Sequence, residues 1–157
     1  MSEKNDTYAS IMKLAQSSLD ILVVPSGHRG TDPPVRAAIA QVEKLFGDSP
    51  NRGCLIAGLW LLIGELDKAH VICQEIPTAH GSAWHAVVHR MEGDFWNSKY
   101  WYRRVGAHPA MQTLKGFDPT SFVDATEAAN GNPDDLIELQ RKEWKALFDW
   151  CLSQNPQ

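Results

Sequence analysis

The sequence predicts an all-α fold, a compact multi-helix domain that spans residues 1–157. Apolar side chains recur at three- and four-residue steps in several segments, and this spacing predicts about seven or eight helices. Proline and glycine stand between these segments, where they end helices. No segment alternates apolar and polar residues over a sustained, β-branched run, so strands are not expected. A length of 157 residues suits one domain around one core.

The sequence up to residue 34 predicts a helix followed by a loop. Helical spacing of apolar residues extends from Tyr8 to Val24, with Asp6 or Thr7 as the N-cap. Pro25 ends this helix, because proline disrupts a helix interior. Residues 25–34 are rich in proline and glycine and predict a loop. This loop does not follow a strand, so it is not expected to bind phosphate.

Two further helices are predicted before the middle of the chain. Asp32 precedes Pro33 and Pro34, a pattern typical of an N-cap and a first turn, and Gly47 ends the helix. Its apolar stripe consists of Val35, Ala38, Ile39, Val42, Leu45 and Phe46. The apolar run 54–64 predicts a buried helix, because a membrane span needs about 20 residues.

Residues 118–153 predict helices that cover the rest of the domain. Asp118 or Thr120 begins a short helix that ends at Ala129, where the sequence NGNP interrupts it. Residues 134–152 then predict a long closing helix. Its apolar positions are Leu136, Leu139, Trp144, Leu147, Phe148 and Cys151.

Composition argues against several classes of protein. The net charge of −4 disfavours a nucleic-acid-binding protein. The polar N-terminus lacks the pattern of a secretory signal, and no segment predicts a membrane span. The three cysteines, Cys54, Cys73 and Cys151, are far apart and outside any CxxC motif, which predicts reduced thiols in a cytoplasmic protein.

The middle of the chain contains an internal repeat. Residues 64–77 and 93–109 each begin with glycine and end with proline. Between these ends, the two copies match in a large apolar residue, a small residue and an aliphatic residue. The matched pairs are Leu66 with Phe95, Ala69 with Ser98, and Ile76 with Val105. A predicted helix precedes each copy, at residues 55–63 and 82–92, so the sequence predicts two stacked hairpins.

This pattern resembles the second helix of tetratricopeptide (TPR) and Sel1-type repeats over residues 52–109. In such repeats glycine makes the turn between helices, the small residue permits close packing and proline ends the unit. The segments HRMEGDFWNSKYWYRRVGAHP and FDPTSFVDATEAA also resemble stretches of a family of small, uncharacterised all-helical proteins. That resemblance implies a shared fold and carries no activity or site.

One helix face carries a candidate metal site. His85, His89 and Glu92 follow at four- and three-residue steps, so they share one face, and His70 in the neighbouring hairpin is positioned to join them. Imidazole and carboxylate are ligands of Zn²⁺, Ni²⁺ and Fe²⁺. The HExxH motif of zinc proteases is absent. The alternative interpretation is that His85 and His89 are boundary residues, hydrogen-bonded to carboxylates or water.

The next helix combines aromatic and basic side chains. Phe95, Ser98, Tyr102 and Val105 suit packing against the preceding helix, which leaves other aromatics for further neighbours or for a ligand. An aromatic surface with arginines suits a small acidic molecule. The candidate ligand-binding residues are Arg90, Tyr100, Trp101 and Arg104. The alternative is that the arginines form ion pairs with acidic residues, including those of the closing helix.

Three functions remain open from the sequence. The first is a helical module that binds a ligand or a protein partner, because TPR-like hairpins form binding surfaces and no catalytic motif is intact. The second is a metal-dependent hydrolase that uses the histidine and glutamate face. The third is a structural or oligomerising protein. The sequence does not determine the oligomeric state.

Overall fold

The computed structural model describes residues 2–25 and 32–154, and within these ranges the chain forms nine helices and no strand. This confirms the predicted all-α fold. In the described part of the chain, no helix combines the length and apolar character needed to cross a membrane. The helices are α1 (Glu3–Ser17), α2 (Pro33–Phe46), α3 (Arg52–Leu61), α4 (Leu66–Cys73), α5 (Ala79–Glu92), α6 (Phe95–Val105), α7 (Pro109–Gln112), α8 (Pro119–Ala128) and α9 (Asp134–Ser153).

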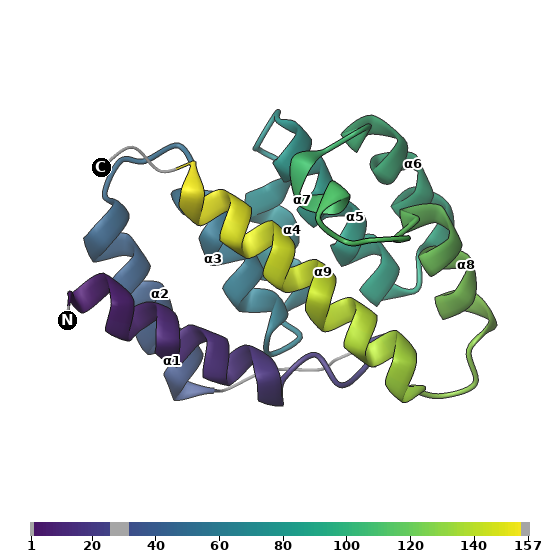
Figure 1. Cartoon of the computed structure of the whole chain (residues 1–157), viewed down its shortest axis with the longest axis horizontal. Coiled ribbons are helices and arrows are strands. Elements are labelled where there is room, and N and C mark those ends of the chain that lie inside the picture. Colours follow the sequence, from purple (N-terminus) through teal and green to yellow (C-terminus); the bar gives the residue numbers. More distant parts are fainter. Residues whose placement is uncertain (1, 26–31, 155–157) are drawn as a thin grey trace.

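The helices pack in sequence order, and the last one joins them. Each helix from α1 to α5 packs against the next one in the chain, and α6 packs against α5 and α8. The long helix α9 crosses this row and contacts α1, α3, α5, α7 and α8 (Figure 1). It therefore contacts helices from both halves of the chain.

The prediction for the first helix is wrong at both ends. α1 begins at Glu3, with Ser2 as its N-cap, and ends at Ser17 instead of Val24. The segment after it is held in a nonhelical path by residues more than 100 positions away. The amide group of Gln140 donates hydrogen bonds to two of its carbonyl oxygens, and the side chain of Asn132 accepts one from a backbone N–H. Hydrogen bonds to residues so far away in the chain cannot be predicted from the spacing of apolar residues within the segment.

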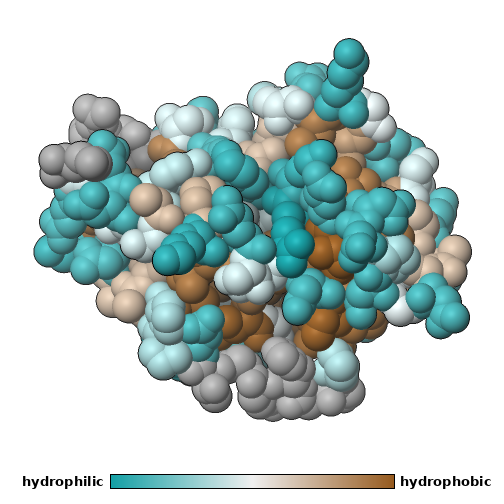
Figure 2. All heavy atoms as spheres, turned by 60° about the horizontal axis from the view of Figure 1, so that its bottom comes forward, coloured by the Kyte–Doolittle hydropathy of each residue, from teal (hydrophilic) through white to brown (hydrophobic). Residues whose placement is uncertain are grey.

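The described residues that follow α1, 18–25, lie along one edge of the molecule (Figure 1). Figure 2 turns this edge toward the viewer and shows apolar atoms gathered among hydrophilic ones. The predicted loop of residues 25–34 lies mostly outside the described residues. The helix after it is confirmed, because α2 has Asp32 at its N-cap, prolines in its first turn and Gly47 at its C-cap.

The two copies of the internal repeat have the same local structure. Gly64 and Gly93 both adopt positive φ, 68° and 81°, at the turns before α4 and α6, where other residues would be strained. The small residues Ala69 and Ser98 are both fully buried. The hydroxyl group of Ser98 donates a hydrogen bond of 2.7 Å to the carbonyl oxygen of Ala86 on α5. Each second helix therefore packs closely, as the repeat predicts.

The core lies where α3, α5 and α9 meet. The indole of Trp144 on α9 packs edge-on against Trp84 on α5, and its Nε1 donates a hydrogen bond of 2.7 Å to the carbonyl oxygen of Gly58 on α3. A side chain at Gly58 would meet the Trp84 ring at 3.1 Å. The apolar run predicted as a buried helix is α3, whose residues from Cys54 to Leu61 are mostly buried. These contacts fix α5, which carries most of the candidate site.

Candidate metal centre and adjoining cleft

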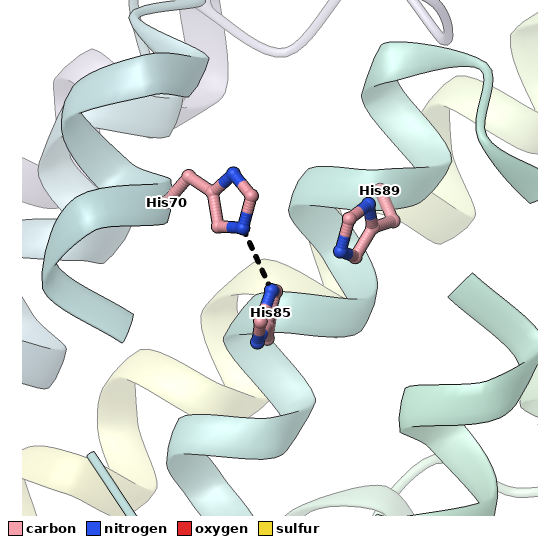
Figure 3. Close-up of side chains that lie close together, drawn as sticks. All are labelled: His70, His85 and His89. Carbon is pink, nitrogen blue, oxygen red and sulfur yellow. Dashed lines mark hydrogen bonds between the residues drawn. The ribbon is translucent and has the colours of Figure 1, made fainter. Parts of the chain in front are cut away.

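Three histidines from two neighbouring helices converge. His70 lies on α4, and His85 and His89 lie one turn apart on α5. One ring nitrogen from each lies within 4.8 Å of the other two. Figure 3 shows the three rings facing one another between the two helices. The convergence of His70 with the α5 histidines, expected from the stacked hairpins, is therefore present.

The chain between α4 and α5 explains this convergence. Thr78 caps α5 by accepting a hydrogen bond from the N–H of Gly81, so the helix begins only a few residues after α4 ends. A side chain at Gly81 would lie 2.2 Å from the carbonyl oxygen of Ile76, so only glycine fits this approach. The short connection and the close contact bring the imidazole of His70 next to that of His85 on α5.

The closest contact in the cluster joins two imidazoles. Nε2 of His70 and Nε2 of His85 are 2.9 Å apart, so one ring donates a hydrogen bond to the other (Figure 3). The ring of His85 also stacks on His89, with centroids 4.7 Å apart and planes 20° apart. A metal ion between the rings would take the place of the proton in this hydrogen bond. Both nitrogens would then donate their lone pairs to the ion.

Acidic side chains lie on the other side of two of these rings. Nδ1 of His89 is 3.1 Å from Oε2 of Glu92 and 3.7 Å from Oδ2 of Asp94, with no hydrogen bond aligned to either. Nδ1 of His70 is 3.8 Å from Oε1 of Glu92. Glu92 therefore lies near the cluster, as predicted, but on the Nδ1 side of the rings. Carboxylates commonly occupy this position behind metal-bound histidines, where they orient the ring.

Burial keeps the central imidazole neutral. Burial, together with the neighbouring His89 and His70, lowers the pKa of His85 to about 4, while Glu92 opposes the shift. A metal ion binds the neutral form of imidazole, so His85 needs no deprotonation at neutral pH. The nearby thiol is less suited, because burial raises the pKa of Cys73 to about 12. A thiol binds metal as the thiolate, so imidazoles are the better ligands here.

The spacing of the nitrogens suits a single ion after a small adjustment. With metal–nitrogen bonds of about 2.0–2.1 Å, two nitrogens on one tetrahedral ion are about 3.3 Å apart and never more than about 4.2 Å apart. The closest pair here is 2.9 Å apart and the span is 4.8 Å. A single ion requires this span to shorten to at most about 4.2 Å. His70, whose side chain is 32% exposed, is the least buried of the three histidines. Three imidazole nitrogens therefore fit one first-row divalent ion.

A cleft adjoins the cluster on the side of α6. Its volume is about 500 Å³, and His85 belongs to both the cluster and the cleft. The ring of His85 stacks on Trp101, with centroids 4.0 Å apart and planes 24° apart. The guanidinium of Arg104 lies 5.4 Å from the centre of the Trp101 ring and 5.9 Å from that of Tyr100. The cleft is lined by Cys73, Gln74, Ile76, Pro77, Thr78, Ala79, Ser82, His85, Trp101 and Arg104.

The predicted ligand-binding residues divide into two groups. Trp101 and Arg104 line the cleft, and Tyr100 lies at its rim, 38% exposed and in contact with both. Arg90 belongs elsewhere, which corrects its assignment to the same ligand site. It is fully buried on the opposite side of α5, where its Nη1 donates a hydrogen bond of 2.8 Å to Glu143 on α9.

Arg90 is instead the centre of a buried polar network. It also donates to the hydroxyl group of Tyr102 and to Oε1 of Gln140, and its guanidinium lies over the ring of Phe122. The hydroxyl group of Tyr102 donates to Glu143. Burial would lower the pKa of Arg90, but Glu143 and Tyr102 raise it above its ordinary value, so the charge is kept. The ion pair with α9 was the alternative expected from the sequence.

Sequence reasoning missed a second pair of histidines. His108 is buried, and its Nδ1 accepts a hydrogen bond of 3.1 Å from the N–H of Ala110, so it caps α7. Its ring packs edge-on against Trp150, and His80 packs against the same indole. These three side chains come from distant parts of the sequence, and no local motif joins them. The contacts with Trp150 give both histidines a packing role.

Comparisons with protein-family models, with curated proteins and with solved structures found no match to this chain. A function of this site has to use the buried imidazole of His85, the partly exposed imidazole of His70 and the adjoining cleft.

Proposed function

We propose that this protein is a metal-dependent hydrolase whose metal ion is bound by His70, His85 and His89. The observation that carries the proposal is that one nitrogen from each imidazole lies within 4.8 Å of the others. Side chains that only need hydrogen bonds usually find them in water or in the backbone. Three imidazoles that face one another instead share a space in which a cation satisfies all of them.

Zn²⁺ suits the proposed site best, ahead of Ni²⁺ and Fe²⁺. Zinc accepts four ligands without a preference from its d-electrons, and catalytic zinc sites commonly use three protein ligands and leave one position open. The typical site for Fe²⁺ uses two histidines and one carboxylate. Here three histidines face one another and Glu92 lies behind two of them, 3.1 and 3.8 Å from their Nδ1 atoms. The donor set therefore favours zinc.

The open position supplies the proposed chemistry. A divalent ion held by His70, His85 and His89 would lower the pKa of a bound water toward about 7 and would so supply hydroxide at neutral pH. In ester hydrolysis the hydroxide adds to the carbonyl carbon, the bond to the alkoxide oxygen breaks and the alcohol leaves with a proton. Glu92 and Asp94 would orient the ring of His89 from its Nδ1 side. A cytoplasmic location, consistent with three free buried cysteines, is part of the proposal.

Isothermal titration with ZnCl₂ tests the metal site. The protein is purified without a histidine tag and stripped with a chelator, and we expect one Zn²⁺ per chain. His85→Ala and His89→Ala should weaken binding by more than the roughly 10- to 100-fold that loss of an outer-shell partner costs. His80→Ala is the matched control, because this histidine lies on the same helix but contacts Trp150 instead. Equal affinity in all four proteins would overturn the site.

Turnover of 4-nitrophenyl acetate tests the hydrolase. We expect the zinc-loaded protein to hydrolyse the ester faster than the metal-free protein, and we expect His85→Ala to lose the difference. His80→Ala should keep it. If the zinc-loaded wild type and His85→Ala hydrolyse the ester at the same rate, the protein binds a metal without this activity.

A binding module is the second candidate function. The observation in its favour is a pair of exposed aromatic rings on α6. Trp96 is 71% exposed, and its ring is parallel to that of Tyr100, with planes 9° apart and centroids 6.1 Å apart. Exposed aromatic side chains are enriched where proteins bind partners. In this alternative the cleft binds a ligand without chemistry, and ester turnover would not depend on the histidines.

A further inference from the structure

The cleft beside the histidine cluster has an unusual balance of charge. The protein as a whole carries a net charge of −4, yet none of the ten residues that line this cleft is acidic. Arg104 is the cationic side chain among them, and the other polar groups are uncharged. A cleft with this lining attracts an anion and repels a cation.

The guanidinium of Arg104 has N–H groups available to donate hydrogen bonds to a ligand. Within the described residues, no carboxylate lies within ion-pair distance of its guanidinium, and its contacts are with the rings of Tyr100 and Trp101. The contacts with these rings are cation–π contacts, so they do not use the N–H groups of the guanidinium. These N–H groups can donate two hydrogen bonds to a carboxylate or a phosphate.

Arg103, its neighbour on α6, provides a contrast. Both arginines are exposed, but Arg103 does not line the cleft. The same helix therefore offers two arginines of equal charge, and one of them lies at the cavity. Comparing variants of these two arginines distinguishes a contact in the cleft from a general effect of net charge.

The remaining walls suit a small organic molecule. Trp101 contributes an indole to one wall, and Ile76 and Pro77 supply further apolar surface. Ser82, Thr78 and Gln74 add uncharged polar groups. A volume of about 500 Å³ lies within the range of small-molecule sites, roughly 300–1,000 Å³. His85 lines the same cavity, so a molecule bound there lies next to the proposed metal ion.

We propose that this cleft binds a small molecule with a terminal carboxylate or phosphate group, which Arg104 holds while the body of the molecule lies against Trp101 and extends to His85. This inference rests on the proposed function, since it names the class of substrate for the same site. The bond to be hydrolysed lies at the end of the molecule opposite its anionic group. Neutral esters of the same size bind more weakly, because they leave Arg104 without a partner.

Nuclear magnetic resonance titrations of the ¹⁵N-labelled, metal-free protein test the cleft. The probes are benzoate, phenyl phosphate and the neutral benzyl alcohol. We expect at least one of the two anions to shift the indole N–H of Trp101 and the amide of Ser82, and to bind about tenfold more tightly than benzyl alcohol. Which anion binds more tightly distinguishes a carboxylate substrate from a phosphate substrate.

The matched variants are Arg104→Gln and Arg103→Gln, which remove the same charge from neighbouring exposed positions. We expect Arg104→Gln to weaken binding of the anion about tenfold and Arg103→Gln to leave it unchanged. Equal weakening in both variants, shifts confined to residues outside the cleft, or no binding of either anion would overturn the inference.

Zinc titration of the same variants separates this inference from the proposed function. Arg104→Gln should bind Zn²⁺ as the wild type does, because Arg104 does not contact the three histidines. If zinc binds and the anions do not, the cleft assignment fails and the metal site stands. If the anions bind through Arg104 and zinc does not, the site binds an acidic ligand but the role of that ligand as a hydrolase substrate is wrong.

Discussion

Two clusters of polar side chains lie on opposite sides of α5, and their environments differ. Arg90 faces the core, where Glu143, Tyr102 and Gln140 accept hydrogen bonds from its two Nη atoms. Its sequence neighbour His89 faces the other way, toward imidazoles that compete for the same space. The first cluster provides its own counter-charge, whereas the second brings three imidazoles together around a His70–His85 hydrogen bond.

This difference separates structural polar groups from functional ones. A buried charge that is paired within the protein needs nothing further, and it costs stability when a partner is lost. Imidazole nitrogens gathered without a matching donor are satisfied when a cation enters. Removing a member of the Arg90 network should therefore reduce stability, and removing a member of the histidine cluster should reduce metal affinity.

The largest expected effect is on stability. Glu143→Leu leaves the guanidinium of Arg90 buried without its counter-charge, and we expect this to lower the free energy of unfolding by about 3–5 kcal/mol. Urea denaturation followed by circular dichroism measures the change. The double variant Arg90→Met/Glu143→Leu is the control, because it removes both charges, and it should recover most of the loss. A single variant as stable as the wild type would contradict a structural role.

The next effect is stabilisation by the metal. If Zn²⁺ binds the folded chain alone, a free concentration of 100 times its Kd should raise the free energy of unfolding by about 2.7 kcal/mol. Urea denaturation with and without ZnCl₂ measures this difference. His85→Ala should show no such gain, and His80→Ala should show the full gain. An equal gain in His85→Ala would indicate that zinc binds at another place.

A smaller effect is expected from the carboxylate behind the rings. Glu92→Gln keeps the size of the side chain and removes the charge near Nδ1 of His89 and His70, so zinc affinity should fall about 10- to 100-fold. Isothermal titration measures the affinity. Glu138→Gln is the matched control, because Glu138 forms a surface ion pair with Lys142 on α9. Identical losses in both variants would show that overall charge, and not this contact, controls affinity.

The smallest effect is expected at the exposed end of the aromatic row. Trp96→Ala removes a ring that is 71% exposed, so the free energy of unfolding should change by no more than about 0.5 kcal/mol. Zinc affinity should be unchanged. Urea denaturation and zinc titration check both expectations. A large loss of stability would mean that α6 depends on this ring for packing.

Local patterns predicted most of the helices. The cap and prolines of α2, the turn glycines Gly64 and Gly93, and the stripe of α9 each depend on nearby residues, so the sequence reveals them. The end of α1 did not follow its apolar spacing. Hydrogen bonds from Gln140 and Asn132 hold the next segment in a different path, and contacts over such distances have no local pattern.

The candidate site likewise has features that the sequence predicted and features that it did not. The spacing of His85 and His89 on one helix predicted their shared face, and the internal repeat predicted that His70 would join them. The side of α5 that Arg90 occupies depends on where α9 packs, so its assignment to the ligand site was wrong. The cleft itself combines the α4–α5 connection with Trp101 and Arg104 on α6, a combination that only the packing of three elements determines.

X-ray absorption at the zinc edge is the most direct test of the central claim that His70, His85 and His89 bind one ion. We expect the zinc-loaded protein to show nitrogen ligands at about 2.0–2.1 Å, with the multiple scattering of three imidazoles and no sulfur at about 2.3 Å. His85→Ala should lose one imidazole from this pattern. A spectrum dominated by sulfur, or one that His85→Ala leaves unchanged, would contradict the claim.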